Sequence, residues 1–249
     1  MPWPLPTDDA ALLALAKAYP FALFPESYLL RDGQAVALRQ LPAAPDRFAG
    51  RVPVIAHGSN RSPAQLARKF GEEAEIPVSR AWLHDHDVVY SAHVTRYGSI
   101  AANVQHTPGV VVEVFVTWLD DGQLRRMHET ELGGEVYIYG RMAGIELQLE
   151  AGPAPRLSEA FVYLSRRGCL AMDRRPVALA EVTARQRGHA ALPQVQAQDL
   201  VRALHGGGAS LDELILRAIR DPAFRQALIG AMGEGAVPTA APHFTELHR

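Results

Sequence analysis

Short apolar runs separated by polar turns fill the middle of the chain, and this pattern predicts strands. We expect strands near residues 52–57, 76–83, 86–93, 109–118, 135–149 (with a turn at Ala143-Gly144) and 159–165. Residues 109–118 are apolar on both faces, which predicts a central strand that is buried on both sides. Because long strands outnumber helices here, the pattern argues against a doubly wound α/β sheet.

Apolar residues recur at helical spacing in other segments. Helices are expected near 10–17, 63–70 and 120–130, and then over 179–187, 199–204, 210–220 and 221–232. Ser210 and Glu213 form a capping-box pattern, and Asp221 followed by Pro222 predicts the start of the last helix. Residues 210–232 carry one apolar face, which we expect to be buried on the same chain or on a second copy.

These elements suggest four parts. Residues 1–50 form an N-terminal extension that should pack on the core, 51–176 a β-rich domain, 177–232 a helical extension, and 233–249 a Pro- and Ala-rich, flexible tail.

The segment 52–70 is the most informative for function. An apolar strand, 52–56, ends at His57-Gly58-Ser59-Asn60, and Ser62-Pro63 then begins a helix with Ser62 as N-cap. Such a turn exposes backbone N–H groups near a helix start, which suits a carboxylate or a developing oxyanion. By spacing alone, a capped strand–helix connection without a ligand explains the pattern equally well.

This segment resembles the Tyr-Gly-Ser-Asn strand–loop–helix of the γ-glutamylcyclotransferase family. The segments that continue the resemblance in the same order are 88–104, Pro108-Gly109 with the strand that follows, Leu124–Glu131 in place of the family's "L..LD..E", and Ala160–Tyr163. The resemblance covers about residues 52–165. It implies an α+β fold, a small mixed β-barrel with external helices, to which the helical C-terminal extension is added.

The resemblance also implies an activity, the release of 5-oxoproline from a γ-glutamyl amine or peptide by intramolecular cyclisation. Glu131 takes the place of the family's acid/base glutamate, and His57, Gly58, Ser59 and Asn60 that of its substrate-binding loop. We expect burial beside apolar strands to raise the pKa of Glu131. Cyclisation needs no metal or cofactor, and we expect none.

Four departures weaken the inference of activity on the standard substrate. His57 replaces the usual Tyr, and His128 replaces the Asp of "LD..E". Leu132 replaces the Gly after the glutamate, and Pro176–Ala180 lacks a Tyr found in family members. The alternative is a non-catalytic member that binds a small acidic metabolite or acts as an interaction module.

Other candidate residues have simpler explanations beside the functional ones. Ser59 with His57 is a weak nucleophile candidate, because the Gly-x-Ser-x-Gly pattern is absent. The quartet His84-Asp85-His86-Asp87 has ligand chemistry but reads as an exposed hairpin turn. Tyr97 and Tyr137 are candidates for lining a substrate pocket, although aromatic residues in strands are more often core. Glu129 and Glu135 carry the same charge as Glu131, so charge alone does not distinguish the three as candidates for the acid/base.

Composition sets further bounds. The 249 residues are 48% hydrophobic with a net charge of −2, which fits a folded core and gives no reason to expect a nucleic-acid or membrane partner. Cys169 is the single cysteine, so neither an intrachain disulfide nor a multi-cysteine metal site is possible. The acidic N-terminus lacks a signal-peptide pattern, and a cytoplasmic location is expected. A homo-oligomer through the C-terminal helices is a further possibility.

Overall fold

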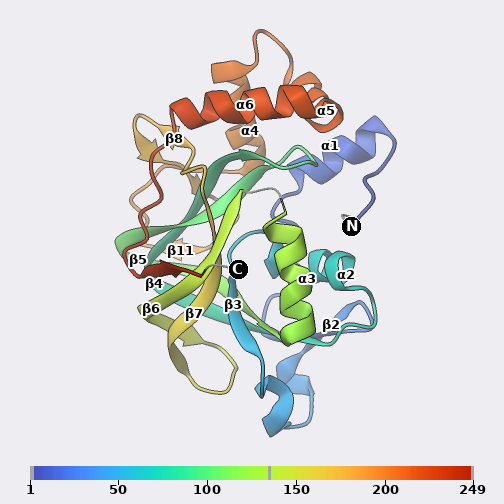
Figure 1. Cartoon of the computed structure of the whole chain (residues 1–249), viewed down its shortest axis with the longest axis vertical. Coiled ribbons are helices and arrows are strands. Elements are labelled where there is room, and N and C mark those ends of the chain that lie inside the picture. Colours follow the sequence, from blue (N-terminus) through green and yellow to red (C-terminus); the bar gives the residue numbers. More distant parts are fainter. Residues whose placement is uncertain (1–2, 134–135, 248–249) are drawn as a thin grey trace.

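A closed barrel forms the centre of the molecule (Figure 1). The structure, a computed structural model, describes residues 3–133 and 136–247. The barrel strands are β3 (Val52–Ala56), β4 (Ile76–Val94), β5 (Ile100–Leu119), β6 (Tyr137–Leu149) and β7 (Arg156–Ser165). Antiparallel pairs β3–β5, β5–β4, β4–β6 and β6–β7 follow one another, and the parallel pair β7–β3 closes the circle. The expected α+β class with a small mixed barrel is confirmed.

The strands β4 and β5 are longer than the pattern predicted. Residues 84–87, expected to form a turn between two strands, lie inside β4, so that prediction is wrong. A register shift against β5 between His84 and His86, with Asp85 at a φ of 58°, accommodates the polar residues without ending the strand. Asp87 is fully buried, and its carboxylate pairs with Arg187 at 2.8 Å.

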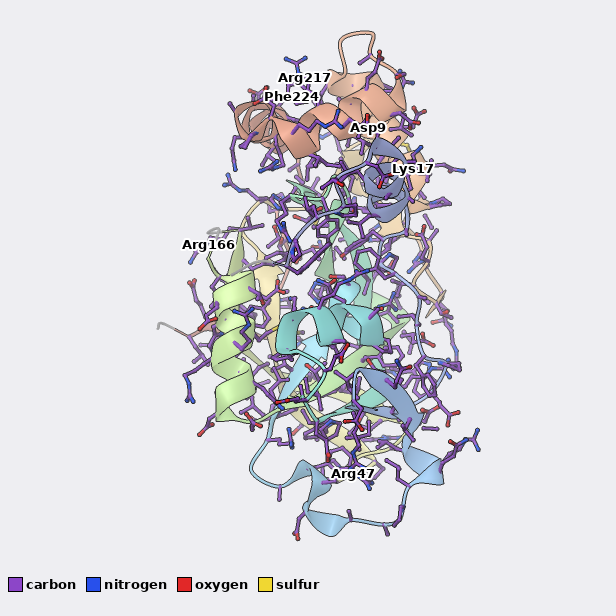
Figure 2. The ribbon with its side chains drawn as sticks, turned by 90° about the vertical axis from the view of Figure 1, so that its right-hand side faces the viewer. Asp9, Lys17, Arg47, Arg166, Arg217 and Phe224 are labelled. Atoms are coloured by element: carbon purple, nitrogen blue, oxygen red, sulfur yellow. The ribbon has the colours of Figure 1, made fainter. Side chains whose placement is uncertain are left out.

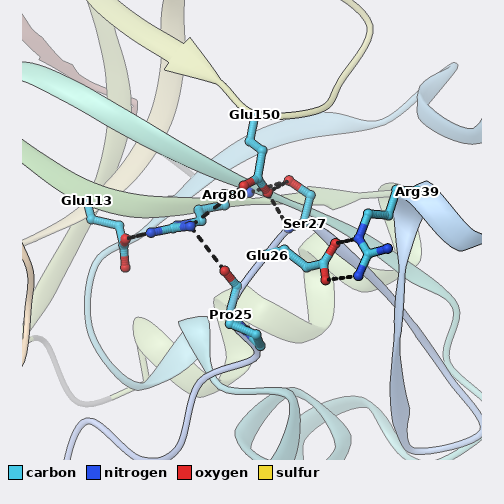
Figure 3. A network of polar contacts seen from close by, with 7 residues as sticks. All are labelled: Pro25, Glu26, Ser27, Arg39, Arg80, Glu113 and Glu150. Carbon is cyan, nitrogen blue, oxygen red and sulfur yellow. Dashed lines mark hydrogen bonds and ion pairs between the residues drawn. The ribbon is translucent and has the colours of Figure 1, made fainter.

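The N-terminal segment extends the sheet and is tied to it by polar contacts. Helix α1 (Asp9–Lys17) precedes β1 (Tyr28–Arg31) and β2 (Gln34–Ala37), and β1 pairs with β4. Figure 3 shows how this segment is anchored: the N–H and hydroxyl of Ser27 donate to Glu150 Oε2 at 2.6 and 2.8 Å, and Arg80 donates to the Pro25 carbonyl. The segment therefore belongs to the wall of the domain.

Short elements connect the longer ones. They are the 3₁₀ turns η1 (Leu38–Gln40), η2 (Pro45–Phe48) and η3 (Ser59–Arg61), helices α2 (Pro63–Phe70) and α3 (Asp121–Glu131), and strands β8 (Ala171–Met172), β9 (Arg175–Pro176), β10 (Ala178–Leu179), β11 (Ala184–Arg185) and β12 (Ala191–Leu192). The prediction of a helix over 179–187 is wrong. Residues 178–179 form β10, which pairs with β4 and β12, and Ala184–Arg185 form β11, which pairs with β5. Pairing with distant strands overrides a weak helical pattern.

Three helices cover one end of the barrel: α4 (Gln194–His205), α5 (Leu211–Arg220) and α6 (Pro222–Glu234). The capping box of Ser210 and Glu213 is confirmed, as is the cap by Asp221, which accepts from the Phe224 N–H. Leu214, Ile215 and Ile229 are buried on this same chain. Figure 2 shows α1 beside these helices, where Lys17 pairs with Asp212 and Arg220 pairs with Asp9.

The C-terminal segment pairs with the barrel instead of extending freely. Strand β13 (Phe244–Glu246) is antiparallel to β6, and Val237 pairs with Cys169. Gly140 makes this possible, because a Cβ there would lie 2.4 Å from the Phe244 ring. Among the described residues, every helix is too short or too polar to cross a bilayer.

Candidate active site

Helix α3 carries Glu131 to the edge of a cavity. The helix begins with a capping box, in which Asp120 accepts from the Gln123 N–H and Gln123 accepts from the Asp120 N–H. It ends at Glu131, as the pattern predicted within one residue. The Glu131 side chain is 15% exposed, so its carboxylate is mostly withdrawn from water.

The two oxygens of Glu131 have different surroundings. Oε1 accepts from Asn60 Nδ2 at 3.1 Å and from Lys69 Nζ in a close ion pair. Oε2 accepts no hydrogen bond from any residue that the structure describes. One oxygen is thus held by two donors, and the other is available to a ligand.

The ion pair reverses the expected protonation behaviour of Glu131. Burial raises the pKa of this carboxyl, but Lys69 and the hydrogen bonds from Lys69 and Asn60 outweigh burial, and the pKa lies below its usual range. The expectation of a raised pKa is therefore wrong. The carboxylate is ionised at neutral pH, ready to accept a proton.

A cavity of about 520 Å³ opens beside this carboxylate. Of the residues that the sequence pointed to, it is lined by Ser59, Tyr97, Tyr137, Glu131 and the mostly exposed Glu129. The other walls come from Tyr19, which follows α1, and from α2, the end of β4 and α6. The volume is within the usual range of small-molecule sites.

Three tyrosines line the cavity: Tyr19 and Tyr97, which are buried, and Tyr137, which is partly buried. Burial raises the pKa of the Tyr97 phenol to about 12, against the opposing influence of the Ser59 side chain. The Tyr137 hydroxyl donates to the Ala102 carbonyl at 3.3 Å, and burial raises its pKa as well. Tyr19 accepts from the Ala102 N–H at 2.9 Å. All three phenols are neutral hydrogen-bonding groups near Glu131 at neutral pH.

The loop 57–60 faces this site only in part. His57 and Gly58 lie behind the cavity wall, and His57 is buried, which lowers its pKa to about 4. A Cβ at Gly58 would lie 2.3 Å from the Tyr19 hydroxyl, so the close approach of these two segments requires glycine. Within the described residues, no protein acceptor takes a hydrogen bond from the N–H of Gly58, Ser59 or Asn60. Of these three residues, Ser59 lines the cavity, and its amide is placed to meet a ligand there.

The competing chemistries receive no support from the geometry. His57 Nδ1 has no hydrogen-bond partner among the described residues, so His57 does not form a dyad with Ser59 through this atom. No group of three His, Cys, Asp or Glu within residues 3–133 and 136–247 is arranged to hold a metal ion. His128 bonds the Tyr163 hydroxyl at 2.8 Å. Glu135 lies outside the described residues.

Five basic residues also line the cavity: Arg68, Lys69, Arg96, Arg126 and Arg225. Arg68 and Arg96 lie 4.9 and 4.7 Å from the Trp3 ring, and Arg126 pairs with Glu129 at 2.7 Å.

The sequence did not point to two of the cavity residues, Lys69 and Tyr19. One sequence feature could have indicated Lys69, because it lies on the helix that directly follows the loop 57–60.

Comparisons with known proteins give weak likenesses. No protein-family model and no curated protein matches this chain. Solved structures similar to it include a gamma-glutamyl cyclotransferase (12% identity, TM-score 0.38, 67% of this chain and 86% of that chain). Others are an uncharacterized protein from Homo sapiens (11%, 0.37, 76% and 90%) and YkqA from Bacillus subtilis (15%, 0.35, 76% and 56%). Similarities this low establish neither an activity nor site residues.

Proposed function

We propose that this chain releases 5-oxoproline from a γ-glutamyl amine or peptide, with Glu131 as the acid/base. One observation carries the proposal: a mostly buried, ionised Glu131 has one oxygen fixed by Asn60 and Lys69 at the wall of a small-molecule cavity, and its other oxygen has no partner among residues 3–133 and 136–247. The order of the sequence motifs supports the same activity.

The reaction requires two protons to move from the attacking nitrogen to the leaving nitrogen. Glu131 Oε2 takes the first from the substrate's α-ammonium, and the neutral amine then attacks the γ-carbonyl carbon, forming the new C–N bond. Glu131 gives that proton to the leaving nitrogen and takes the second from the attacking nitrogen. The old C–N bond breaks, the lactam remains, and the second proton leaves with the amine.

The neighbouring groups have separate roles in this proposal. The N–H groups of the loop 58–60, in which Ser59 lines the cavity, and the Tyr97 hydroxyl are donors for the substrate's carboxylate and for the oxyanion. Tyr137, whose hydroxyl donates to the Ala102 carbonyl, lines the same cavity. The cavity walls hold the γ-glutamyl chain in a folded conformation. The amine then lies close to the carbonyl, which lowers the entropic cost of the cyclisation. No covalent enzyme intermediate is needed.

The test is incubation of the protein with γ-glutamyl amino acids, γ-glutamyl alkylamines and γ-glutamyl peptides, with 5-oxoproline as the measured product. Release from at least one class supports the proposal. Because the cavity is rich in arginine, the alternative is a protein that only binds a small acidic metabolite. Saturable binding of γ-glutamyl compounds without any 5-oxoproline would favour that alternative.

A further inference from the structure

Lys69 is a buried lysine, and among the described residues its ammonium pairs with one carboxylate, that of Glu131. Its side chain is 7% exposed, and Nζ contacts Glu131 Oε1 and, at 3.7 Å, the Met127 sulfur. The backbone carbonyl of Lys69 accepts from Arg126 Nε at 3.0 Å, which fixes α2 against α3. The ammonium is therefore placed by two helices and is not a mobile surface group.

Several features of the site oppose a charged Glu131. The carboxylate is largely removed from water, and it lies at the C-terminal end of α3, where the helix dipole disfavours a negative charge. Tyr19, Tyr97, Tyr137 and His57 also interact with Glu131, but all four are neutral at pH 7. Arg68, Arg126 and Glu129 line the same cavity, and Arg126 and Glu129 pair with each other. Within the described part of the chain, Lys69 is the cation that pairs with Glu131.

A lysine is better suited than an arginine to pair with Glu131 at position 69. The chain has two lysines, Lys17 and Lys69, among 25 basic residues. A guanidinium at position 69 would bring five donors to a place where the available acceptors are one carboxylate oxygen and a thioether. A compact ammonium neutralises Glu131 through Oε1 alone and leaves Oε2 free.

We propose that Lys69 is a positioning residue that keeps Glu131 ionised and turns its Oε2 toward the cavity. Its catalytic consequence rests on the proposed function, since Lys69 acts only through Glu131. Without Lys69, burial would favour the protonated carboxyl, which cannot accept a proton from the substrate. The pair itself is a property of the protein and is testable without turnover.

The kinetic test compares wild type, Lys69→Met and Lys17→Met over a range of pH, with a γ-glutamyl amide that the wild type cyclises. Methionine keeps the length of lysine and removes its charge. Lys69→Met should move the acidic limb of kcat/KM upward by about one pH unit or more, the usual effect of losing an adjacent opposite charge. Lys17 pairs with Asp212 on the surface, and Lys17→Met should leave the limb in place. An unmoved limb in Lys69→Met would overturn the proposal.

A second measurement separates this inference from the proposed function. Isotope-labelled lysine gives two side-chain NMR signals, which Lys17→Met assigns. The Lys69 signal should shift with pH as Glu131 titrates, and Glu131→Gln should abolish that shift. If no γ-glutamyl amide is cyclised but the shift behaves so, the proposed function fails and the pair stands. If the pH-dependent shift of the Lys69 signal is the same in Glu131→Gln as in wild type, the ion pair is refuted, whatever the activity.

Discussion

Asn60 donates from Nδ2 to Glu131 Oε1 at 3.1 Å, across 71 positions of sequence. This bond joins the turn after β3 to the last residue of α3. It places the loop that resembles a substrate-binding motif against the carboxylate that resembles an acid/base. The proposed chemistry depends on this meeting of two segments.

Asn60→Asp tests how far this contact controls Glu131. The substitution keeps the shape of the side chain but brings a second carboxylate beside Oε1, and like charges raise each other's pKa. The acidic limb of kcat/KM should therefore move to higher pH. Steady-state release of 5-oxoproline between pH 4 and pH 8 measures it, and a limb identical to wild type would contradict the contact.

Unfolding should depend on pH through His57. Its pKa is about 4 in the folded protein and about 6.5 when unfolded, so the native state favours the neutral ring. The resulting stability is complete above pH 6.5 and is lost as the pH falls toward 4. Between these values His57→Gln should reduce the slope of unfolding free energy against pH by about 1.4 kcal/mol per unit. Urea titrations measure the slope; an equal slope in both proteins would refute the prediction.

Arg187→Met should destabilise the protein strongly. It leaves the fully buried Asp87 without its ion partner, and breaking a buried pair from one side costs about 3–5 kcal/mol. The exposed pair of Arg141 and Glu159 is the control, because Arg141→Met should cost about 1 kcal/mol or less. Equal losses in the two variants, measured by chemical denaturation, would contradict this ranking.

Truncation after residue 205 should lower the melting temperature. It removes α5 and α6, whose Leu214, Ile215, Leu228 and Ile229 are buried, and each such side chain contributes about 1.5–3 kcal/mol. Calorimetry measures the melting temperature, and light scattering measures the number of chains per particle. A lower number of chains in the truncated protein would support the proposal that these helices also join copies of the chain. An unchanged melting temperature with an unchanged number of chains would contradict the stabilising role of α5 and α6.

The sequence predicted the elements whose signals are local. Apolar periodicity located the strand 52–56 and the helix 63–70, and capping residues located α5 and α6. Prediction failed at 84–87 and 179–187, where a bulge and pairing with β5 decide the conformation. Such effects depend on strands distant in sequence.

The site was predictable only through its motifs. Glu131 and Ser59 were identified, and both line the cavity. Tyr19 was missed, because its position depends on how the N-terminal segment docks. The direction of the Glu131 pKa was missed because Lys69 belongs to another helix, 62 positions away. Charge neighbours of this kind appear only when the fold is known.

The proton-transfer role of Glu131 is tested by the rate of 5-oxoproline release by Glu131→Gln. Glutamine keeps the size of the side chain but cannot carry a proton, so turnover should fall by about 10²–10⁴-fold. Glu129→Gln is the matched control, because Glu129 is 64% exposed and paired with Arg126, and it should cost little. Full activity of Glu131→Gln, on a substrate that the wild type cyclises, would show that Glu131 is not the acid/base.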